Sequence, residues 1–363
     1  MILSPARRRA ILGCAILVLV GAGAACTRTA PTVARATRPP AAAASPTPVS
    51  TGTVTLEFAG DVHFTGRTRK LLNEPATAFG AITSVLSDAD VTSVNLETAV
   101  TSRGTPQPKR FHFQAPPSAF DAVRGAGIDM VTIANNHVLD YGRIGLSDTL
   151  AAAHAADFPT IGAGVDADAA WAPWLTTVRG TRIAYLGVSD VQELASRWIA
   201  TPHRSGEAIA NNLTRTLDAV RAARRQADVV VVFMHWGTEG DSCPDANQER
   251  LARKLSAAGA GIIIGSHVHT LQASGWLGKT YVAYGMGNFL WYIPSWSTQT
   301  GVLRLTLHTT ATGALSSTPL TARLTPAIVS STGQPVVATG AKGRSILRRY
   351  ASLRACAGLT ATP

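Results

Sequence analysis

Cysteine and charged residues are both scarce in this chain of 363 residues. Only four cysteines are present, and neither of the two beyond residue 50 lies in a Cys-x-x-Cys pair, so a thiolate metal site is not expected. Charged residues make up 15% of the chain and hydrophobic residues 46%. That length and composition are ample to bury a core, and they suit one large domain or two closely packed halves.

Acidic residues are absent from residues 1–50, a stretch that holds six arginines. The formal net charge of +11 comes from 33 basic and 22 acidic residues, and without those six arginines it is +5. The high pI is therefore partly a property of the N-terminal segment, and it does not indicate a nucleic-acid partner. A mildly basic exported domain would still be attracted to polyanions at the cell surface.

The N-terminus has the pattern of a secretory signal. Three arginines at 7–9 precede an apolar run, Ile11–Ala25, and small residues lead into Cys26. The run is shorter than the ~20 residues that a membrane span needs. Gly23–Cys26 also resembles a bacterial lipoprotein box, so we predict a signal peptide over 1–26 with Cys26 lipidated. The protein would then sit at the outer face of the cytoplasmic membrane, in the cell envelope; plain secretion and an uncleaved anchor are the alternatives.

Residues 27–52 are rich in Ala, Pro, Thr and Ser and have no apolar periodicity, which indicates a flexible tether. The folded domain is expected over 53–363. Of the cysteines, only Cys243 and Cys356 fall in it, and in an oxidising compartment they would either pair or remain free. A bridge would tie the C-terminal helix back to the core.

Within the domain, short apolar runs alternate with helical patterns, which predicts βα units, a largely parallel sheet and the α/β class. The expected strands are Val54–Ala59, Val91–Asn95, Met130–Ala134, Arg182–Val188, Val229–Met234, Gly261–Gly265 and Thr280–Tyr284. The expected helices are Arg69–Ser87, Ser118–Ala126, Ile144–Ala156, Ile209–Gln226, Ala246–Ala258 and Lys342–Cys356. An antiparallel region is expected after Gly301.

Five of these strands end in polar residues. The residues concerned are Asp61 and His63, Glu97, Asn135 with Asn136 and His137, His235, and His267 with His269. In an α/β sheet the carboxyl ends of the strands face one crevice, where ligands bind. Singly, each has a plainer interpretation: Asp61 as a turn former, Glu97 as a helix cap, His235 as a core histidine. Together they predict one clustered site.

The donor types in that cluster indicate a metal site. Imidazole, carboxylate and amide oxygen suit Zn, Mn, Fe or another borderline divalent metal. Asp61 and His63 are two residues apart, so in an extended segment they project to the same side, and His267 and His269 share that spacing. Two such pairs and a bridging carboxylate would make a two-metal cluster, of the kind with ions ~3.5–4 Å apart.

Six segments carry a family resemblance: FAGDVHFTGR, NLETAV, TIANNHVLDYG, HWGTEG, GSHVHTLQ and YGMGNF, spread from Phe58 to Phe289. They resemble the calcineurin-like metallophosphoesterase superfamily and, more closely, the CapA (PgsA) family of capsule and poly-γ-glutamate synthesis proteins. The resemblance implies a metallophosphoesterase-like four-layer α/β/β/α sandwich. It also implies two divalent metal ions, with an anionic polymer or phosphoester as substrate.

The same resemblance implies roles for individual residues. One metal would be held by Asp61, His63 and His269, and the other by Asn136, His235 and His267, with Glu97 bridging where the wider superfamily uses Asp. His137 occupies the place of the catalytic histidine, and Asp140 would orient it.

Outside the cluster, three basic residues in or near the motif loops are candidates for substrate binding: Arg67, Lys109 and Arg143. Ordinary solvated charges are the alternative for each. Trp291, Tyr292 and Trp296 would form a lid, an aromatic wall or part of the core.

Three functions remain open on this sequence. The first is an envelope-anchored CapA-like protein that serves synthesis, release or attachment of an anionic polymer. The second is a metal-dependent hydrolase of phosphoesters or γ-glutamyl amides unrelated to capsule. The third is a non-catalytic interaction subunit of a membrane polymer synthase.

Overall fold

A computed structural model of the chain describes residues 52–295, 297–310 and 320–363. The predicted signal peptide and, apart from Gly52, the predicted tether lie outside these residues, so both domain boundaries stay predictions. Among the residues described, none of the helices combines the length and apolar character that a membrane span requires.

Eight strands form the first sheet. They are β1 (Thr53–Val62), β2 (Val91–Leu96), β5 (Met130–Thr132), β6 (Thr160–Ile161), β15 (Asn288–Leu290), β16 (Gln299–His308), β17 (Thr321–Val329) and β18 (Pro335–Val337). Their order is β18-β17-β16-β1-β2-β5-β6, with β15 paired to β1. The pairs β1–β2, β2–β5 and β5–β6 are parallel, whereas β16, β17 and β18 are antiparallel, as predicted for the chain after Gly301.

Six strands form the second sheet. They are β8 (Trp174–Val178), β9 (Thr181–Ser189), β11 (Val229–Trp236), β12 (Ile262–His267), β13 (Ser274–Leu277) and β14 (Thr280–Ala283), in the order β13-β14-β12-β11-β9-β8. Two small pairs accompany the sheets, β3 (Ala99–Val100) with β4 (Gln114–Ala115) and β7 (Ala163–Gly164) with β10 (Gly206–Glu207). The strands β9, β11, β12 and β14 run parallel to one another, so their carboxyl ends reach the same edge.

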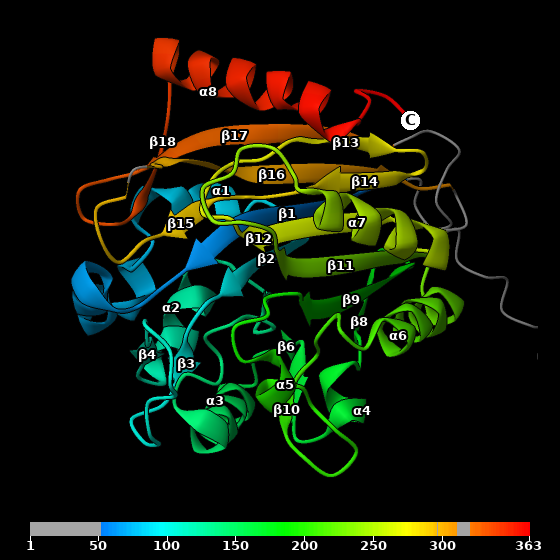
Figure 1. Cartoon of the computed structure of the whole chain (residues 1–363). Coiled ribbons are helices and arrows are strands. Elements are labelled where there is room, and N and C mark those ends of the chain that lie inside the picture. Colours follow the sequence, from blue (N-terminus) through cyan, green and yellow to red (C-terminus); the bar gives the residue numbers. More distant parts are fainter. Residues whose placement is uncertain (1–51, 296, 311–319) are drawn as a thin grey trace, which may run out of the picture. The chain divides into compact units, whose positions relative to one another are not determined.

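The α-helices within the described residues are α1 (Thr83–Leu86), α2 (Ser118–Gly125), α3 (Gly142–Ala155), α4 (Ala167–Ala170), α5 (Ala195–Trp198), α6 (Leu213–Gln226), α7 (Ala246–Ala258) and α8 (Gly340–Ser352). Residues of α2 and α3 share a core with the first sheet, and residues of α6 and α7 share one with the second. Figure 1 shows α6 and α7 beside β9 and β11, and α8 above β17.

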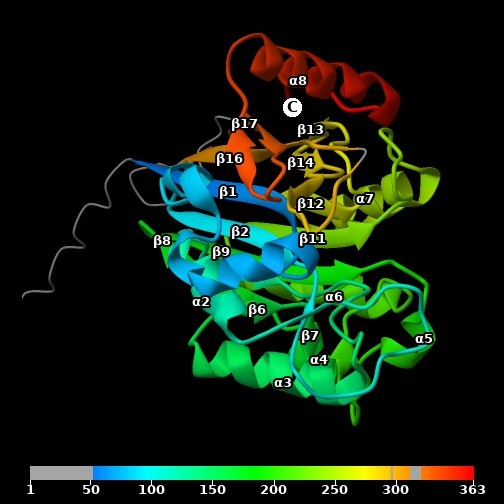
Figure 2. The ribbon, with the colours of Figure 1, turned by 90° about the vertical axis from the view of Figure 1, so that its left-hand side faces the viewer.

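Alternation along the strands explains why the sheets stack. In β11, Val229, Val231 and Phe233 belong to the core between the sheets, whereas Val230, Val232 and Met234 pack with the helices. Such a period of two places alternate side chains on opposite faces. Because both sheets are apolar on both faces, each is covered twice, and Figure 2 shows strands of both sheets lying between helices. The predicted four-layer α/β/β/α sandwich is confirmed.

The predicted helix over Arg69–Ser87 is wrong. The segment forms three short 3-10 helices and one turn of α-helix, namely η1 (Gly66–Asn73), η2 (Pro75–Thr77), η3 (Gly80–Ile82) and α1. Pro75 disfavours helical geometry at the residue before it and starts a new turn, and Gly80 has a φ of 64°. Helix signals within the window were genuine, but these two residues interrupt them.

A disulfide joins Cys243 to Cys356, so of the two alternatives, paired or free cysteines, the structure has the paired one. The two residues are 113 positions apart. The bridge ties the loop before α7 to the 3-10 helix η4 (Leu353–Ala357) that follows α8, which secures the C-terminal segment. Closing a loop of that size stabilises a fold by roughly 5 kcal/mol, mainly by restricting the unfolded chain.

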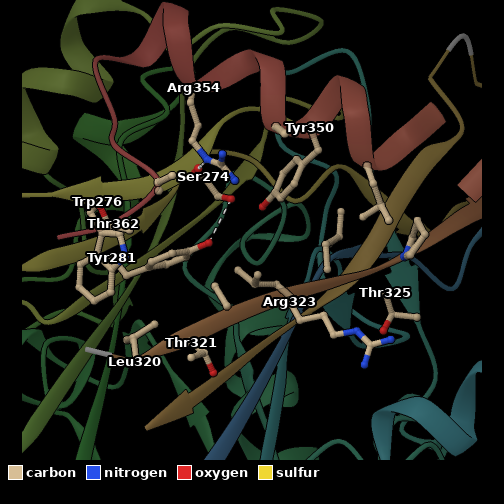
Figure 3. A pocket seen from close by; sticks show the side chains of 18 of the residues that line it. Ser274, Trp276, Tyr281, Leu320, Thr321, Arg323, Thr325, Tyr350, Arg354 and Thr362 are labelled. Carbon is tan, nitrogen blue, oxygen red and sulfur yellow. Dashed lines mark hydrogen bonds between the residues drawn. The ribbon is translucent and has the colours of Figure 1, made fainter. Parts of the chain in front are cut away.

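Between α8 and the strands β13, β14 and β17 lies a cavity of about 1090 Å³. Figure 3 shows Tyr281 and Tyr350 reaching into it from opposite sides, with the Tyr281 hydroxyl 3.1 Å from Ser274 Oγ. None of the described residues that line this cavity belongs to the polar cluster at the strand ends.

Candidate metal centre

The polar cluster forms where strands of both sheets end. In β1 the pairing with β2 shifts register between Phe58 and Asp61, and beyond that irregularity Asp61 pairs with Asn95. Irregularities of this kind re-aim side chains at sheet edges and active sites. The result is that a carboxylate of β1 and a carboxamide of β2 lie side by side in the crevice.

Asp61 is fully buried, and both of its carboxylate oxygens have partners. Oδ1 accepts a hydrogen bond from Asn95 Nδ2 at 2.8 Å. Oδ2 lies 3.3 Å from the backbone nitrogen of His267 and 3.3 Å from His269 Nδ1. Asp61 therefore links β1 to the loop after β12, across the two sheets. Asn95 was not among the predicted site residues, because only the register between β1 and β2 sets it beside Asp61.

Glu97 stands between two histidines. Its Oε2 lies 3.0 Å from His63 Nε2, and its Oε1 lies 3.3 Å from His235 Nε2. Burial raises the pKa of Glu97, but the adjacent rings of His235 and His63 outweigh it and hold the pKa well below its usual value. Glu97 is thus an ionised carboxylate in a dry site, with one oxygen turned to each side.

His235 is oriented from both ring nitrogens. Register between β11 and β12 pairs His235 with Ser266, and Ser266 Oγ lies 2.9 Å from His235 Nδ1. On the other side, Nε2 lies 2.8 Å from Asn136 Oδ1. Partners on one ring nitrogen that aim the other are typical of metal-binding histidines. Ser266 is a second residue that the sequence interpretation did not single out.

His267 and His269 lie on a strained turn. Their φ angles are 85° and 57°, a region that residues with side chains rarely adopt, and such strain clusters at functional sites. Nδ1 of His267 is buried and has no hydrogen-bond partner among the described residues. Burial, with the neighbouring His235 and His269, lowers the pKa of His267 well below its usual value. This ring is therefore neutral and has a free lone pair.

His269 is electrostatically the opposite case. Burial lowers its pKa, but the hydrogen bond to Asp61 and the nearby Glu97 carboxylate prevail and raise it to about 9. Two buried carboxylates thus draw positive charge to this position. Glu239, at the exposed margin, approaches His269 Nε2 to 3.9 Å.

Ligand atoms gather closely enough to hold a cation in three overlapping groups of residues: Glu97 with His235 and His267, Asp61 with Glu97 and His269, and Glu239 with His267 and His269. Within each group the atoms lie within 4.8 Å of one another. A buried unpartnered imidazole nitrogen on His267 and the two buried carboxylates Asp61 and Glu97 fit a divalent metal. His63 contacts the cluster through Glu97, and Asn136 contacts it through His235.

Beside the cluster, His137 is held by Asp140. His137 Nδ1 lies 2.7 Å from Asp140 Oδ2, and the backbone nitrogen of Phe113 donates to the same oxygen at 2.6 Å. Burial raises the pKa of Asp140 to about 7, against the lowering effect of Lys109. Burial, together with the charge of Lys109, lowers the pKa of His137 well below its usual value.

Lys109 lies behind this pair, and its side chain is almost fully buried. Its ammonium lies 3.0 Å from Asp140 Oδ1 and 3.1 Å from Glu193 Oε2, donates to the backbone oxygen of Asn136, and lies 5.1 Å from the centre of the Trp198 ring. These contacts make Lys109 a support for Asp140. A role in binding substrate stays a prediction.

Arg67 and Arg143 do not enter the cluster. Arg67 donates to the backbone oxygens of Trp291 and Ser331, and Arg143 donates to those of Ser205 and Arg197. In this structure both guanidinium groups hold loops, and their predicted contact with substrate remains untested.

Aromatic rings close one side of the cluster. Trp291 is buried, with its ring centre 4.6 Å from that of His63 and 4.5 Å from that of His269. The ring centre of Phe113 lies 4.3 Å from that of His137, with the two ring planes tilted by 40°. Of the three predicted alternatives, a lid, an aromatic wall or part of the core, Trp291 is therefore an aromatic wall against the histidines. Trp296 lies outside the described residues.

One further carboxylate at the same edge was missed. Asp190 directly follows β9, a strand that was predicted without a polar residue at its end, and its backbone nitrogen donates to the backbone oxygen of His235 at 2.8 Å. Its signal was the same as that of the other five strand ends.

Most of these elements lie in a part of the chain that matches a known protein family. A family model described as "Bacterial capsule synthesis protein PGA_cap" matches residues 55–292. This chain belongs to that family. The matched range contains every metal-ligand candidate from Asp61 to His269, so the site lies within the part of the chain that defines the family.

Two relatives carry names from capsule synthesis. The chain is 32% identical over 246 residues to "Capsule biosynthesis protein CapA" of Bacillus anthracis, which covers 65% of this chain and 59% of that protein. It is 28% identical over 298 residues to "PGA biosynthesis protein CapA" of Bacillus subtilis (strain 168), covering 80% of this chain and 76% of that protein. The chain thus spans about three-fifths of the length of the first relative.

Among solved structures, the chain resembles the NAD nucleotidase of Haemophilus influenzae, with a TM-score of 0.45 and 13% identity, over 86% of this chain and 65% of that one. A likeness at this level does not bear on activity or substrate. The layers and the strand order show the α/β/β/α sandwich that the family resemblance implied.

Proposed function

We propose that this protein is an exported metal-dependent hydrolase that acts on an anionic polymer during capsule or poly-γ-glutamate synthesis. Two divalent ions, of Mn, Zn or Fe, would occupy the cluster. Asp61, His63 and His269 would hold one and Asn136, His235 and His267 the other, with Glu97 between them.

The observation that carries the proposal is the position of Glu97. It belongs to two of the three groups able to hold a cation, one with Asp61 and one with His235, and its two oxygens point to different histidines. A carboxylate shared in this way supports two adjacent ions rather than one. When bound, such a pair activates water and stabilises the negative charge that develops on the group under attack.

The residues beside the cluster would manage the proton. The contact of His137 Nδ1 with Asp140 places the ring proton on Nδ1 when Asp140 is ionised, which leaves the lone pair on Nε2. His137 Nε2 would take up a proton and deliver it to the leaving group. Lys109 keeps Asp140 in place and favours its ionised form. Trp291 and Phe113 exclude water from one side of the histidines.

Wild-type protein tests the proposal directly. After reconstitution with Mn²⁺ or Zn²⁺, elemental analysis is expected to give about two ions per chain, and the loaded protein should hydrolyse an aryl phosphodiester or a γ-glutamyl oligomer. Fewer than one ion per chain would reject the metal centre. Full loading without turnover of either substrate would favour a non-catalytic subunit of a polymer synthase.

Anchoring in the envelope is a separate part of the proposal, and it depends on Cys26. If this residue is lipidated, Cys26→Ser should move the protein from the membrane fraction to the soluble fraction of cells that export it. Cys14→Ser, within the same apolar run, is the matched control and should leave the protein in the membrane fraction. Membrane retention of the Cys26→Ser protein would show that the anchor is not a lipid on Cys26.

A further inference from the structure

A second polar pocket adjoins the metal centre on the side of the second sheet. It has a volume of about 370 Å³, and His267 belongs both to its lining and to the metal-ligand groups. Most of the remaining lining comes from the loop after β9 and from the start of α7, including Asp190, Asn247 and Arg250. It therefore opens beside His267 and carries charged groups of both signs.

Three of the residues that line this pocket are joined by side-chain hydrogen bonds. Arg250 donates a hydrogen bond to Asn247 Oδ1, and Asn247 Nδ2 donates to Asp190 Oδ2. One carboxamide thus separates a guanidinium from a carboxylate. Because Asn247 occupies only one oxygen of Asp190, the other oxygen remains available to a ligand.

Asp190 is also tied to the metal centre. Its backbone nitrogen donates to the backbone oxygen of His235 at 2.8 Å. A group bound at Asp190 is therefore next to the strand end that carries His235. Gln192 supports the loop by donating to the backbone oxygen of Asp190 at 2.7 Å and by exchanging hydrogen bonds with Asn211 at 2.8 Å. The acidic end of the pocket is therefore held in place before any ligand arrives.

We propose that this pocket binds the ammonium and carboxylate groups of an α-amino acid unit at the end of the substrate, with Asp190 facing the ammonium and Arg250 facing the carboxylate. The inference rests on the proposed function, since it assumes that the neighbouring bond is the one placed at the metal centre. It narrows the substrate to an amide-linked chain that ends in a free amino acid.

Other ligand classes fit less well. A lone phosphate or carboxylate would be attracted to Arg250 but repelled by Asp190 and Asp245, which also lines the pocket. A lone cation would meet the reverse conflict at Arg250. Asp245 is already engaged as the cap of α7, where its side chain accepts from the backbone nitrogen of Gln248 at 2.8 Å. A zwitterion satisfies both ends through charge-assisted hydrogen bonds.

Calorimetric binding to the metal-reconstituted full chain tests this assignment without requiring turnover. The probes are γ-glutamylglutamate and its N-acetylated form, which lacks the ammonium. We expect acetylation to weaken binding roughly tenfold or more in the wild type, and less than about threefold in Asp190→Asn, because the variant no longer distinguishes the two probes. Arg250→Gln should weaken binding of both probes about tenfold.

The matched control is Arg253→Gln, one turn along α7, where the arginine pairs with Glu249 at 3.2 Å and does not line the pocket. It should bind both probes as the wild type does. Equal affinity for the two probes in the wild type, or equal effects of Arg250→Gln and Arg253→Gln, would overturn the assignment even if the protein hydrolyses an aryl phosphodiester. Selective binding without any hydrolysis would uphold the pocket and reject the proposed function instead.

Discussion

Replacing His235 by Ala is expected to lower the rate of hydrolysis about a thousandfold or more and to remove about one metal ion per chain. The ring of His235 touches Asn136 through Nε2, approaches Glu97, and is held by Ser266 through Nδ1. Register between β11 and β12 sets His235 beside Ser266, and the ring belongs to one of the groups able to hold a cation, with Glu97 and His267. Elemental analysis and turnover of the reconstituted variant measure the two effects together.

His154→Ala is the matched control, since His154 is an exposed histidine on α3. It should retain full metal content and activity. A thermal melt of both variants separates misfolding from metal loss, because His235 is buried and its replacement leaves a small cavity. A folded His235→Ala protein with wild-type metal content and activity would contradict the proposed centre.

Replacing His137 by Gln is expected to reduce turnover by roughly 10² to 10⁴ while metal content stays at the wild-type level. His137 lies beside the ligand groups and is held by Asp140, so its loss removes proton transfer without removing a donor to the cation. The expected signature is a lower kcat with little change in KM, because a proton-transfer group acts in the transition state. Steady-state kinetics alongside metal analysis distinguish this outcome from the loss of an ion.

Asp140→Asn should show the same signature at a smaller size, since it acts through the orientation of His137. The control is Asp121→Asn on α2, where the carboxylate is exposed and lies in the first turn of the helix. Loss of metal from His137→Gln, or a change confined to KM, would assign His137 to the ligand set or to substrate binding and remove it from proton transfer.

Much of the fold could be predicted because central strands such as β2, β11 and β12 are buried on both faces. Continuous apolar runs such as Val229–Met234 are therefore unambiguous, and five of the predicted strands lead into the polar residues of the cluster. Prediction was wrong for Arg69–Ser87, where the helical composition is genuine but Pro75 and Gly80 divide it. Local backbone constraints prevailed there over the average tendency of a window of residues.

The partners of the predicted ligands could not be derived in the same way. Asn95 and Ser266 orient Asp61 and His235, yet in the sequence each is an ordinary polar residue in a strand. They matter because strand register sets them beside a ligand, and register is a property of pairing between distant segments. Lys109 is a second example. In the sequence it is a lysine of the kind that is usually exposed, but in the structure its side chain is buried against Asp140 and Glu193.

By itself, the sequence determined the α/β class, the places where strands end, and the chemical types of the donors gathered there. These follow from hydrophobic periodicity and from the spacing of residues along a single strand, which are local properties. Only the tertiary structure decided which donors share a point in space, that Glu97 stands between two histidines, and that Cys243 pairs with Cys356. Those outcomes depend on how two sheets stack and register, and contacts between residues far apart in the chain are set by packing rather than by any short stretch of sequence.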